Sequence, residues 1–438
     1  MGSVAAISIL ALTVALSLGR PQIGRLKIHH AHAAAIGALL VLGLRVLPLD
    51  LFLVAAKLLA LPVVTIVSLM AITLIAERAG LFEIVANALA RRARGSGRRL
   101  FTSLFVTGTL VGTFFTNDAA VLIFTPLVFH LVEKIGGDWT LEQKLPFYFA
   151  VLYVGNLVGA LVIANPINIV VSSLFQIGFV EYARWMVFPA AVSAAISFAG
   201  LWFFFGSAIP RRFELAAQPR ADAPRRRLQA LCAGGLLLTL MGFFAEPLTG
   251  IPTWAVATAG ALTLLAVHLT LGEGGPRPIL RGVGWDVIVF LCGMFLVGMG
   301  LRNAGFTHVL GGWIQDLAGG DLARMRLSTG FIAAVCSAVL NNHPTAGMMA
   351  WTIQDFNLPP TETRMLAFSA LVGGDLGPKM LPIGSLAALI WFRLLRDRGV
   401  EIPYRLYIKI GVPVTLVAVV ASILALNLES WVVLHLLP

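Results

Sequence analysis

Long apolar stretches recur along the whole chain and are separated by short polar segments. A helix needs about 17–25 apolar residues to cross the hydrocarbon core of a bilayer. The pattern therefore predicts an all-α polytopic membrane protein. Two stretches, at about 100–130 and 327–354, are interrupted in the middle by polar residues. The others are expected to be complete spans, at 3–19, 31–47, 51–76, 146–177, 185–208, 229–247, 251–271, 284–303, 364–394 and 406–427.

The composition supports this class and makes the lipid bilayer the expected partner. Hydrophobic residues make up 58% of the 438 residues and charged residues only 12%, against roughly 25% charged residues in soluble domains. The net charge of +11 does not indicate nucleic-acid binding, because the basic residues lie in short loops, most densely at 91–99 and 210–227. Short basic loops are typical of the cytoplasmic side of a membrane protein.

The loop charges also predict how the spans are oriented. They place the N-terminus on the outer side of the membrane. Both ends of each interrupted stretch then lie on one side, so both stretches are expected to be re-entrant hairpins. The first span lacks the basic flank of a cleaved signal peptide and is expected to be retained. The predicted cytoplasmic loops are 20–30, 77–99, 130–145, 209–228, 272–283 and 393–405.

An internal repeat divides the chain into two halves. Segment 76–82 is similar to segment 301–307, and segment 116–118 is similar to segment 341–343, a spacing of 225 residues in both cases (301 − 76 and 341 − 116). The predicted halves are 1–208 and 229–438, joined by a basic cytoplasmic linker at 209–228. Each half holds five spans and one hairpin, and because five is odd the second half must be inverted. Inverted repeats with interrupted helices are typical of secondary transporters that bind substrate near the bilayer midplane.

Four breaks are predicted at membrane depth, at 116–118, 165–168, 341–345 and 373–382. Such breaks occur only where protein or a water-filled cavity surrounds them. In three of them a proline, Pro166, Pro344 or Pro382, is expected to be the first residue of a new helix. Asn165 is a favoured N-cap, whereas His343 is not and needs another explanation. The new helix ends would direct N–H groups toward a neutral, oxygen-rich solute or an anion.

Uncharged polar residues gather at these breaks and are the candidate substrate ligands. Asparagine offers two donors and an acceptor without charge, which suits a neutral, oxygen-rich solute. The same side chains could instead satisfy the broken backbone, and we expect both roles to occur. The predicted substrate-binding residues are Thr116, Asn117, Asn165, Asn168, Asn341, Asn342, Thr345 and Ser385.

Charged residues at the breaks are the candidates for proton coupling. Asp118 lies at a hairpin tip, where it either handles substrate or protons or caps a helix. Asp375 and Lys379 are spaced to form an ion pair, either a structural one or one that opens during transport, although the glycine and proline between them favour an irregular turn. Asp118 has only neutral neighbours, so we expect it to carry the proton while Asp375 stays ionised. His343 is a candidate pH sensor or a structural, hydrogen-bonded histidine.

The segments FTNDAAVLIFTP (115–126), VLNNHPT (339–345) and GDLGPKMLPIGSLA (374–387) carry a family resemblance. They are similar to the motifs of the bacterial arsenite efflux permeases, within the ion transporter superfamily, and the resemblance covers essentially the whole chain. It implies efflux of arsenite or antimonite, as neutral trihydroxides such as As(OH)3, across the inner (cytoplasmic) membrane of a bacterium by proton antiport. It also implies an arsenical pump ATPase as a partner in some operons. His343 departs from the family, where methionine is expected. A sodium/proton antiporter of the same superfamily is the alternative.

Other classes of site find no support in the sequence. Cys232, Cys292 and Cys336 lie far apart in apolar segments, so we expect neither a disulfide framework nor a metal site. The chain has no nucleophile–base or metal-protease motif and no Walker A sequence. We therefore expect a transporter rather than an enzyme, with no cofactor.

Overall fold

The computed structural model describes residues 2–19, 21–23, 26–213, 223–271 and 275–436, and almost all of them are helical. The β-structure is a short antiparallel pair, β1 (Gln22–Ile23) with β2 (Leu26–Lys27). The helices of the first part are α1 (Gly2–Gly19), α2 (His30–Gly43), α3 (Leu49–Arg78), α4 (Leu81–Ala93), α5 (Gly97–Phe114), α6 (Asn117–Ile135), α7 (Leu141–Val154), η1 (Val162–Ala164), α8 (Pro166–Leu174) and α9 (Phe179–Phe205). Those of the second part are α10 (Ala223–Phe244), α11 (Glu246–Thr249), α12 (Thr253–Leu271), α13 (Arg277–Gly282), α14 (Trp285–Asn303), α15 (Phe306–Ala318), α16 (Leu322–Leu340), α17 (Asn342–Asp355), α18 (Pro360–Leu376), η2 (Gly377–Lys379), α19 (Leu386–Arg396) and α20 (Tyr404–Leu436).

Helices long and apolar enough to cross a membrane dominate the described part of the chain. They are α3, α9, α10, α12, α14, α16 and α20. Helices α1 and α2 are apolar but shorter. The predicted spans 146–177 and 364–394 are each split into α7 and α8 or α18 and α19. The predicted loop 77–99 is not a loop throughout, because α4 packs apolar side chains such as Phe82 and Leu89 into the core.

The order of elements repeats between the two parts of the chain. A long helix (α3 or α14) leads to a short one (α4 or α15), then two helices that meet at a break, a broken helix, and a long helix (α9 or α20). Helices α4 and α15 both follow a glycine in the left-handed conformation, Gly80 (φ 77°) and Gly305 (φ 81°), which are equivalent positions of the sequence repeat. The inversion of the second half and the boundaries at 208 and 229 stay predictions, and residues 214–222 of the linker lie outside the described part.

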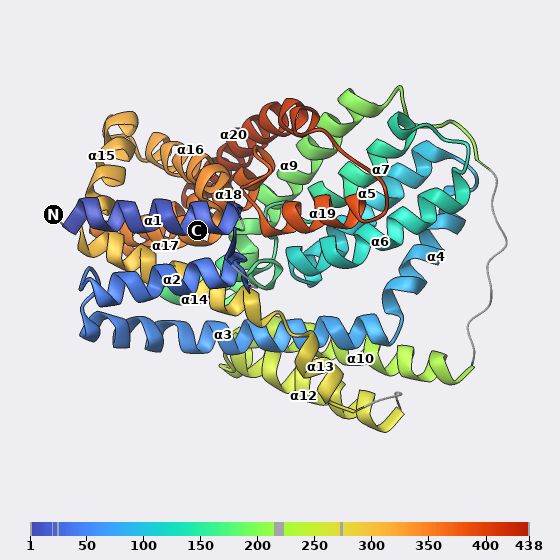
Figure 1. Cartoon of the computed structure of the whole chain (residues 1–438), viewed down its shortest axis with the longest axis horizontal. Helices are drawn as coiled ribbons and strands as arrows, with labels where there is room; N and C mark the ends of the chain where they lie inside the picture. Colours follow the sequence, from blue (N-terminus) through green and yellow to red (C-terminus); the bar gives the residue numbers. More distant parts are fainter. Residues whose placement is uncertain (1, 20, 24–25, 214–222, 272–274, 437–438) are drawn as a thin grey trace.

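The two halves are interleaved rather than separate. Helix α2 packs on α14, α12 packs on α3, and α9 packs on α20 (Figure 1). In the middle, α19 of the second half lies against α6 of the first, and α8 contacts α17 and α18. The broken helices therefore meet at the contact between the halves.

Glycines allow the second half to pack closely around its break. A Cβ on Gly373 would lie 2.0 Å from the carbonyl oxygen of Gly330, and a Cβ on Gly377 would lie 2.2 Å from that of Ala334. Helices α16 and α18 therefore approach backbone to backbone, as small residues permit in membrane proteins. This explains why the motif before the break is rich in glycine.

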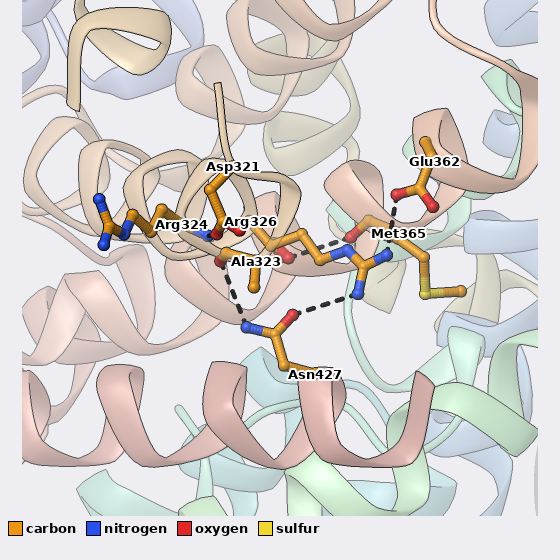
Figure 2. Close-up of polar contacts among 8 residues, drawn as sticks. Asp321, Ala323, Arg324, Arg326, Glu362, Met365 and Asn427 are labelled. Carbon is orange, nitrogen blue, oxygen red and sulfur yellow. Dashed lines mark hydrogen bonds and ion pairs between the residues drawn. The ribbon is translucent and has the colours of Figure 1, made fainter. Parts of the chain in front are cut away.

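Ion pairs hold the hairpin helices at the ends farthest from their tips. Figure 2 shows the guanidinium of Arg326 on α16 donating to Glu362 Oε2 on α18 (2.8 Å) and to Asn427 Oδ1 on α20 (3.2 Å). In the first half, Lys144 on α7 pairs with Glu133 on α6 at 2.8 Å. A buried arginine is stable only when it is paired. These contacts therefore fix the ends of the hairpin helices that lie farthest from the tips.

Candidate functional site

A buried carboxylate joins the two halves at the centre of the molecule. Asp375, in the last turn of α18, is only 1% exposed. Its Oδ2 accepts hydrogen bonds from the backbone N–H of Gly159 (2.9 Å) and from Nδ2 of Asn168 (3.2 Å). Its Oδ1 accepts from Nδ2 of Asn165 at 2.7 Å. Three predicted site residues are thus brought into one cluster, although Asp375 lies more than 200 positions from Asn165 and Asn168 in the chain.

The first-half side of this cluster is built by an asparagine cap. Asn165 is extended (φ −146°, ψ 137°), and its Oδ1 accepts from the backbone N–H of Ile167 at 3.3 Å. Pro166 is the first residue of α8, as predicted. Because the cap uses Oδ1, the amide nitrogen of Asn165 is free to donate to Asp375. Gly159 leaves room for this arrangement, since a Cβ there would lie 2.5 Å from Nδ2 of Asn168.

Lys379 does not pair with Asp375, although sequence spacing permits it. The chain between them tightens into the 3-10 turn η2, the irregular turn that the glycine and proline favoured. Lys379 is 1% exposed. Its Nζ lies 3.4 Å from Oγ of Ser197 and 5.1 Å from the ring centroid of Tyr153. Neither partner was predictable from the sequence, because both belong to the other half.

The second hairpin turns at Asn341, and the new helix begins at Asn342. The sequence had predicted that Pro344 would be its first residue. Asn341 is the N-cap of α17, with φ 84° and ψ 155°, so Pro344 is the third residue of the helix. Its Oδ1 accepts from the backbone N–H of His343 (3.2 Å) and lies 3.1 Å from Nδ1 of the same residue. The cap preference of asparagine prevails over that of proline for the first position. His343 needs no capping role, because it lies inside the first turn.

Three acceptor atoms at the breaks have no partner among the described residues. They are Oδ1 of Asn168, Oδ1 of Asn342 and Nε2 of His343. All three residues are buried, with 0%, 8% and 5% exposure. Nearly all buried polar atoms in proteins form hydrogen bonds, so these atoms are candidates for contact with a ligand. Thr345, another predicted ligand, instead donates to the carbonyl oxygen of Asn341 at 2.8 Å.

The first hairpin borders a cavity near the breaks. Asn117 begins α6 and, with Thr113 and Gly159, lines a cavity of about 380 Å³. Thr116 is buried just before the helix, and its carbonyl oxygen accepts from the backbone N–H of Ala120 at 2.9 Å. The side chain of Asp118, the predicted proton carrier, lies outside the described part of the structure.

The last break is also capped differently from our prediction. Helix α18 continues to Leu376, so the break begins at Gly377 rather than Gly373. The new helix α19 does not start at Pro382: Ser385 is its N-cap, and the Ser385 Oγ accepts from the backbone N–H of Ala388 at 3.3 Å. A hydroxyl cap is stronger than the proline preference, and it occupies Ser385 in this conformation.

A histidine group near the second tip was missed in the sequence, although three histidines in four positions at a helix start are a visible signal. His30 Nε2 lies 3.1 Å from Asp286 Oδ2, and the rings of His29 and His32 are 3.9 Å apart. The ring of Phe290 lies 5.5 Å from that of His30 and 5.3 Å from that of His343. Phe290 therefore separates this group from the tip.

The three cysteines take no part in these clusters. Cys232, Cys292 and Cys336 are free and lie on α10, α14 and α16. Among the residues whose placement is described, no group of three or more His, Cys, Asp or Glu side chains has a geometry that could hold a metal ion. The described part of the candidate site thus offers amides, hydroxyls, the His343 imidazole, the Asp375 carboxylate and the Lys379 amine.

Solved structures share the fold at low sequence identity. The YdaH transporter of Alcanivorax borkumensis is similar over 99% of this chain and 98% of its own, with a TM-score of 0.57 and 14% identity. MtrF of Neisseria gonorrhoeae, described with a class of antimetabolite efflux pumps, gives a TM-score of 0.50 at 14% identity, over 100% of this chain and 96% of its own. These likenesses support the architecture alone.

Sequence relatives are closer. An arsenical pump membrane protein of Escherichia coli is 33% identical over 98% of this chain and 99% of its own length. A second from Escherichia coli is 35% identical over 83% of this chain and 85% of its own. A putative arsenical pump membrane protein of Bacillus subtilis is 27% identical over 79% and 82%. Residues 5–432 match the family described as "Arsenical pump membrane protein", and the chain belongs to that family.

Proposed function

We propose that the protein exports arsenite or antimonite trihydroxide from the cytoplasm in exchange for protons. The observation that carries the proposal is the cluster in which Asp375 of one half is held by Asn165 and Asn168 of the other. A carboxylate at membrane depth is expensive and usually functional. Because this one bridges the broken helices of both halves, any change in its contacts also changes how the halves meet. Membership of the family supplies the substrate class.

The uncharged ligands suit a neutral trihydroxide. Each hydroxyl of As(OH)3 both donates and accepts hydrogen bonds, so it needs partners of both kinds. Asn117 lines the cavity of about 380 Å³ next to the cluster, and Asn168 keeps an unpaired Oδ1. Asn165 and Ser385 are occupied as caps, which favours a role in positioning the backbone over direct contact with substrate.

Proton exchange is assigned to Asp118, with Asp375 remaining ionised. Three donors converge on Asp375, and donors aimed at a carboxylate stabilise its charged form. A proton on Asp375 would turn one acceptor into a donor and disrupt the contact between the halves. Asp118 directly follows Asn117, which lines the cavity, in the first turn of α6, and its neighbours in the sequence are uncharged.

Uptake of arsenite into inside-out vesicles tests this function. With an imposed proton gradient and no ATPase present, the wild-type chain should accumulate arsenite, and Asp118→Asn should lose gradient-driven accumulation while still binding arsenite. If uptake occurred only with an arsenical pump ATPase present, ATP hydrolysis rather than the proton gradient would be the energy source. Accumulation by Asp118→Asn equal to wild type would refute the role of Asp118.

The alternative is a sodium/proton antiporter, favoured by the carboxylate and the unpaired Oδ1 of Asn168, since hard cations prefer oxygen ligands. The same vesicles distinguish it: an imposed Na⁺ gradient should move protons without arsenite.

The proposed orientation, with the N-terminus outside, is tested by labelling single cysteines at positions 94 and 324, which should react from opposite sides of the membrane.

A further inference from the structure

The first turn of α17 holds two unpaired acceptors on consecutive residues. Asn342 Oδ1 and His343 Nε2 are both buried and have no partner among the described residues. They stand at the start of a 14-residue helix, where free backbone groups are donors and the helix dipole is positive. A ligand bound there meets acceptors as well as donors, which is an unusual combination for a helix N-terminus.

The tautomer of His343 follows from the cap. Asn341 Oδ1 accepts the backbone N–H of His343 at 3.2 Å, and this fixes which way the Asn341 amide is turned. The same oxygen lies 3.1 Å from His343 Nδ1. An amide oxygen cannot donate, so Nδ1 must carry the hydrogen. In a neutral imidazole the other nitrogen is then an acceptor, and Nε2 is held in that role.

The backbone at this tip is held in an unfavourable conformation. Asn341 has φ 84° and ψ 155°, a region that is essentially reserved for glycine and is strained for other residues. Such strain persists where the surroundings enforce it, most often at ligand sites. Here it allows one side chain both to cap α17 and to orient the His343 ring.

We infer that Asn342 Oδ1 and His343 Nε2 form an acceptor pair for the hydroxyl hydrogens of the substrate. The inference rests on the proposed function and adds a basis for selectivity. A neutral trihydroxide supplies O–H donors that match both acceptors. An oxyanion with few or no hydrogens would place its charge against their lone pairs, so the pair selects against oxyanions that a bare helix N-terminus would attract.

The tip is closed in this conformation. The void beside Asn341, lined in part by Thr13, Ser17 and Phe290, measures only about 10 Å³, which is close to the minimum for one water molecule. Phe290 lies against the His343 ring on this side. Movement of the Phe290 side chain or of α17 must therefore precede binding, and the acceptors are shielded from water until then.

Two substitutions at His343 separate the acceptor from the cap. Asparagine can reproduce the Nδ1 contact with Asn341 but has no atom where Nε2 lies. Glutamine reaches the Nε2 position with an amide oxygen. Arsenite uptake driven by a proton gradient is measured with the full chain in liposomes and compared among wild type, His343→Asn and His343→Gln.

We expect His343→Asn to raise the KM for arsenite about 3–10-fold with Vmax within twofold, since one hydrogen bond is lost. His343→Gln should stay within twofold of wild type, antimonite should show the same pattern, and arsenate should not compete in the wild type. Equal KM values for all three proteins, equal losses for both variants, or strong competition by arsenate would overturn the inference. Failure of the wild type to transport arsenite would instead refute the proposed function.

Discussion

Helices α8 and α17 begin with the same device and use it for opposite purposes. Asn165 and Asn341 each accept the backbone N–H two residues ahead, at 3.3 and 3.2 Å. At α8 the spare amide nitrogen donates to Asp375 of the other half. At α17 the cap oxygen instead orients His343, whose Nε2 has no partner among the described residues. The cap of α8 therefore connects the two halves, whereas the cap of α17 orients a side chain that keeps an unpaired acceptor.

The difference shows that a cap motif alone does not define a site. Both asparagines satisfy the backbone, which is the role that most polar residues at a break must fill. What distinguishes them is the group brought opposite by the fold: a carboxylate at α8, and an aromatic ring, Phe290, at α17. Substitutions should therefore have unlike effects at the two breaks.

The largest effect is expected from Asp375→Asn. The amide cannot accept from Gly159, Asn165 and Asn168 together. At least one buried donor therefore loses its partner, which costs about 1–3 kcal/mol, and the remaining hydrogen bonds are weaker because they are no longer charge-assisted. The purified protein should unfold at a clearly lower temperature, and transport should be lost. Restoration by the exchange Asn165→Asp with Asp375→Asn would show that the contact, not the position of the charge, is required. Wild-type stability of Asp375→Asn would mean that the cluster does not hold the halves.

A smaller effect is expected from Gly373→Ala, which disturbs the packing of α18 against α16. The added methyl group would lie 2.0 Å from the Gly330 carbonyl oxygen, so α16 and α18 must separate, and overpacking of this kind costs about 1–3 kcal/mol. Gly312→Ala on α15 is the matched control, because nothing lies within 4 Å of its new Cβ. Thermal unfolding of both proteins should show a loss only for Gly373→Ala. An equal loss of stability in both variants would mean that replacing a helical glycine is destabilising in itself, whatever its packing.

The smallest effect is expected from replacing Cys232, Cys292 and Cys336 together by alanine. The thiols lie on three different helices and outside both breaks, so arsenite resistance and uptake should remain close to wild type. Buried free cysteine usually acts as a small hydrophobic residue. Loss of uptake by a folded triple variant would place arsenic–sulfur bonds in the mechanism and remove the acceptor account.

The sequence predicted where helices break better than what the breaks contact. Interruption of apolar stretches by Asn, Gly and Pro located all four, because such residues cannot continue a membrane helix without compensation. The starts at Pro344 and Pro382 were wrong, since Asn341 and Ser385 are stronger caps nearby. The partners of Asp375 were not predictable, because Asn165 lies 210 positions away and only the packing of the halves brings it there. The contacts of Lys379 with Ser197 and Tyr153 were not predictable for the same reason.

The position of bound arsenic tests the account most directly. Crystals of the full chain grown with arsenite, measured at the arsenic absorption edge, should give one anomalous peak. We predict it beside the first turn of α17, within hydrogen-bonding reach of Asn342 and His343 through the hydroxyl groups, with Phe290 displaced. A peak beside Cys232, Cys292 or Cys336, or one inside the Asp375 cluster with the α17 turn unchanged, would contradict the assignment of binding to the second hairpin.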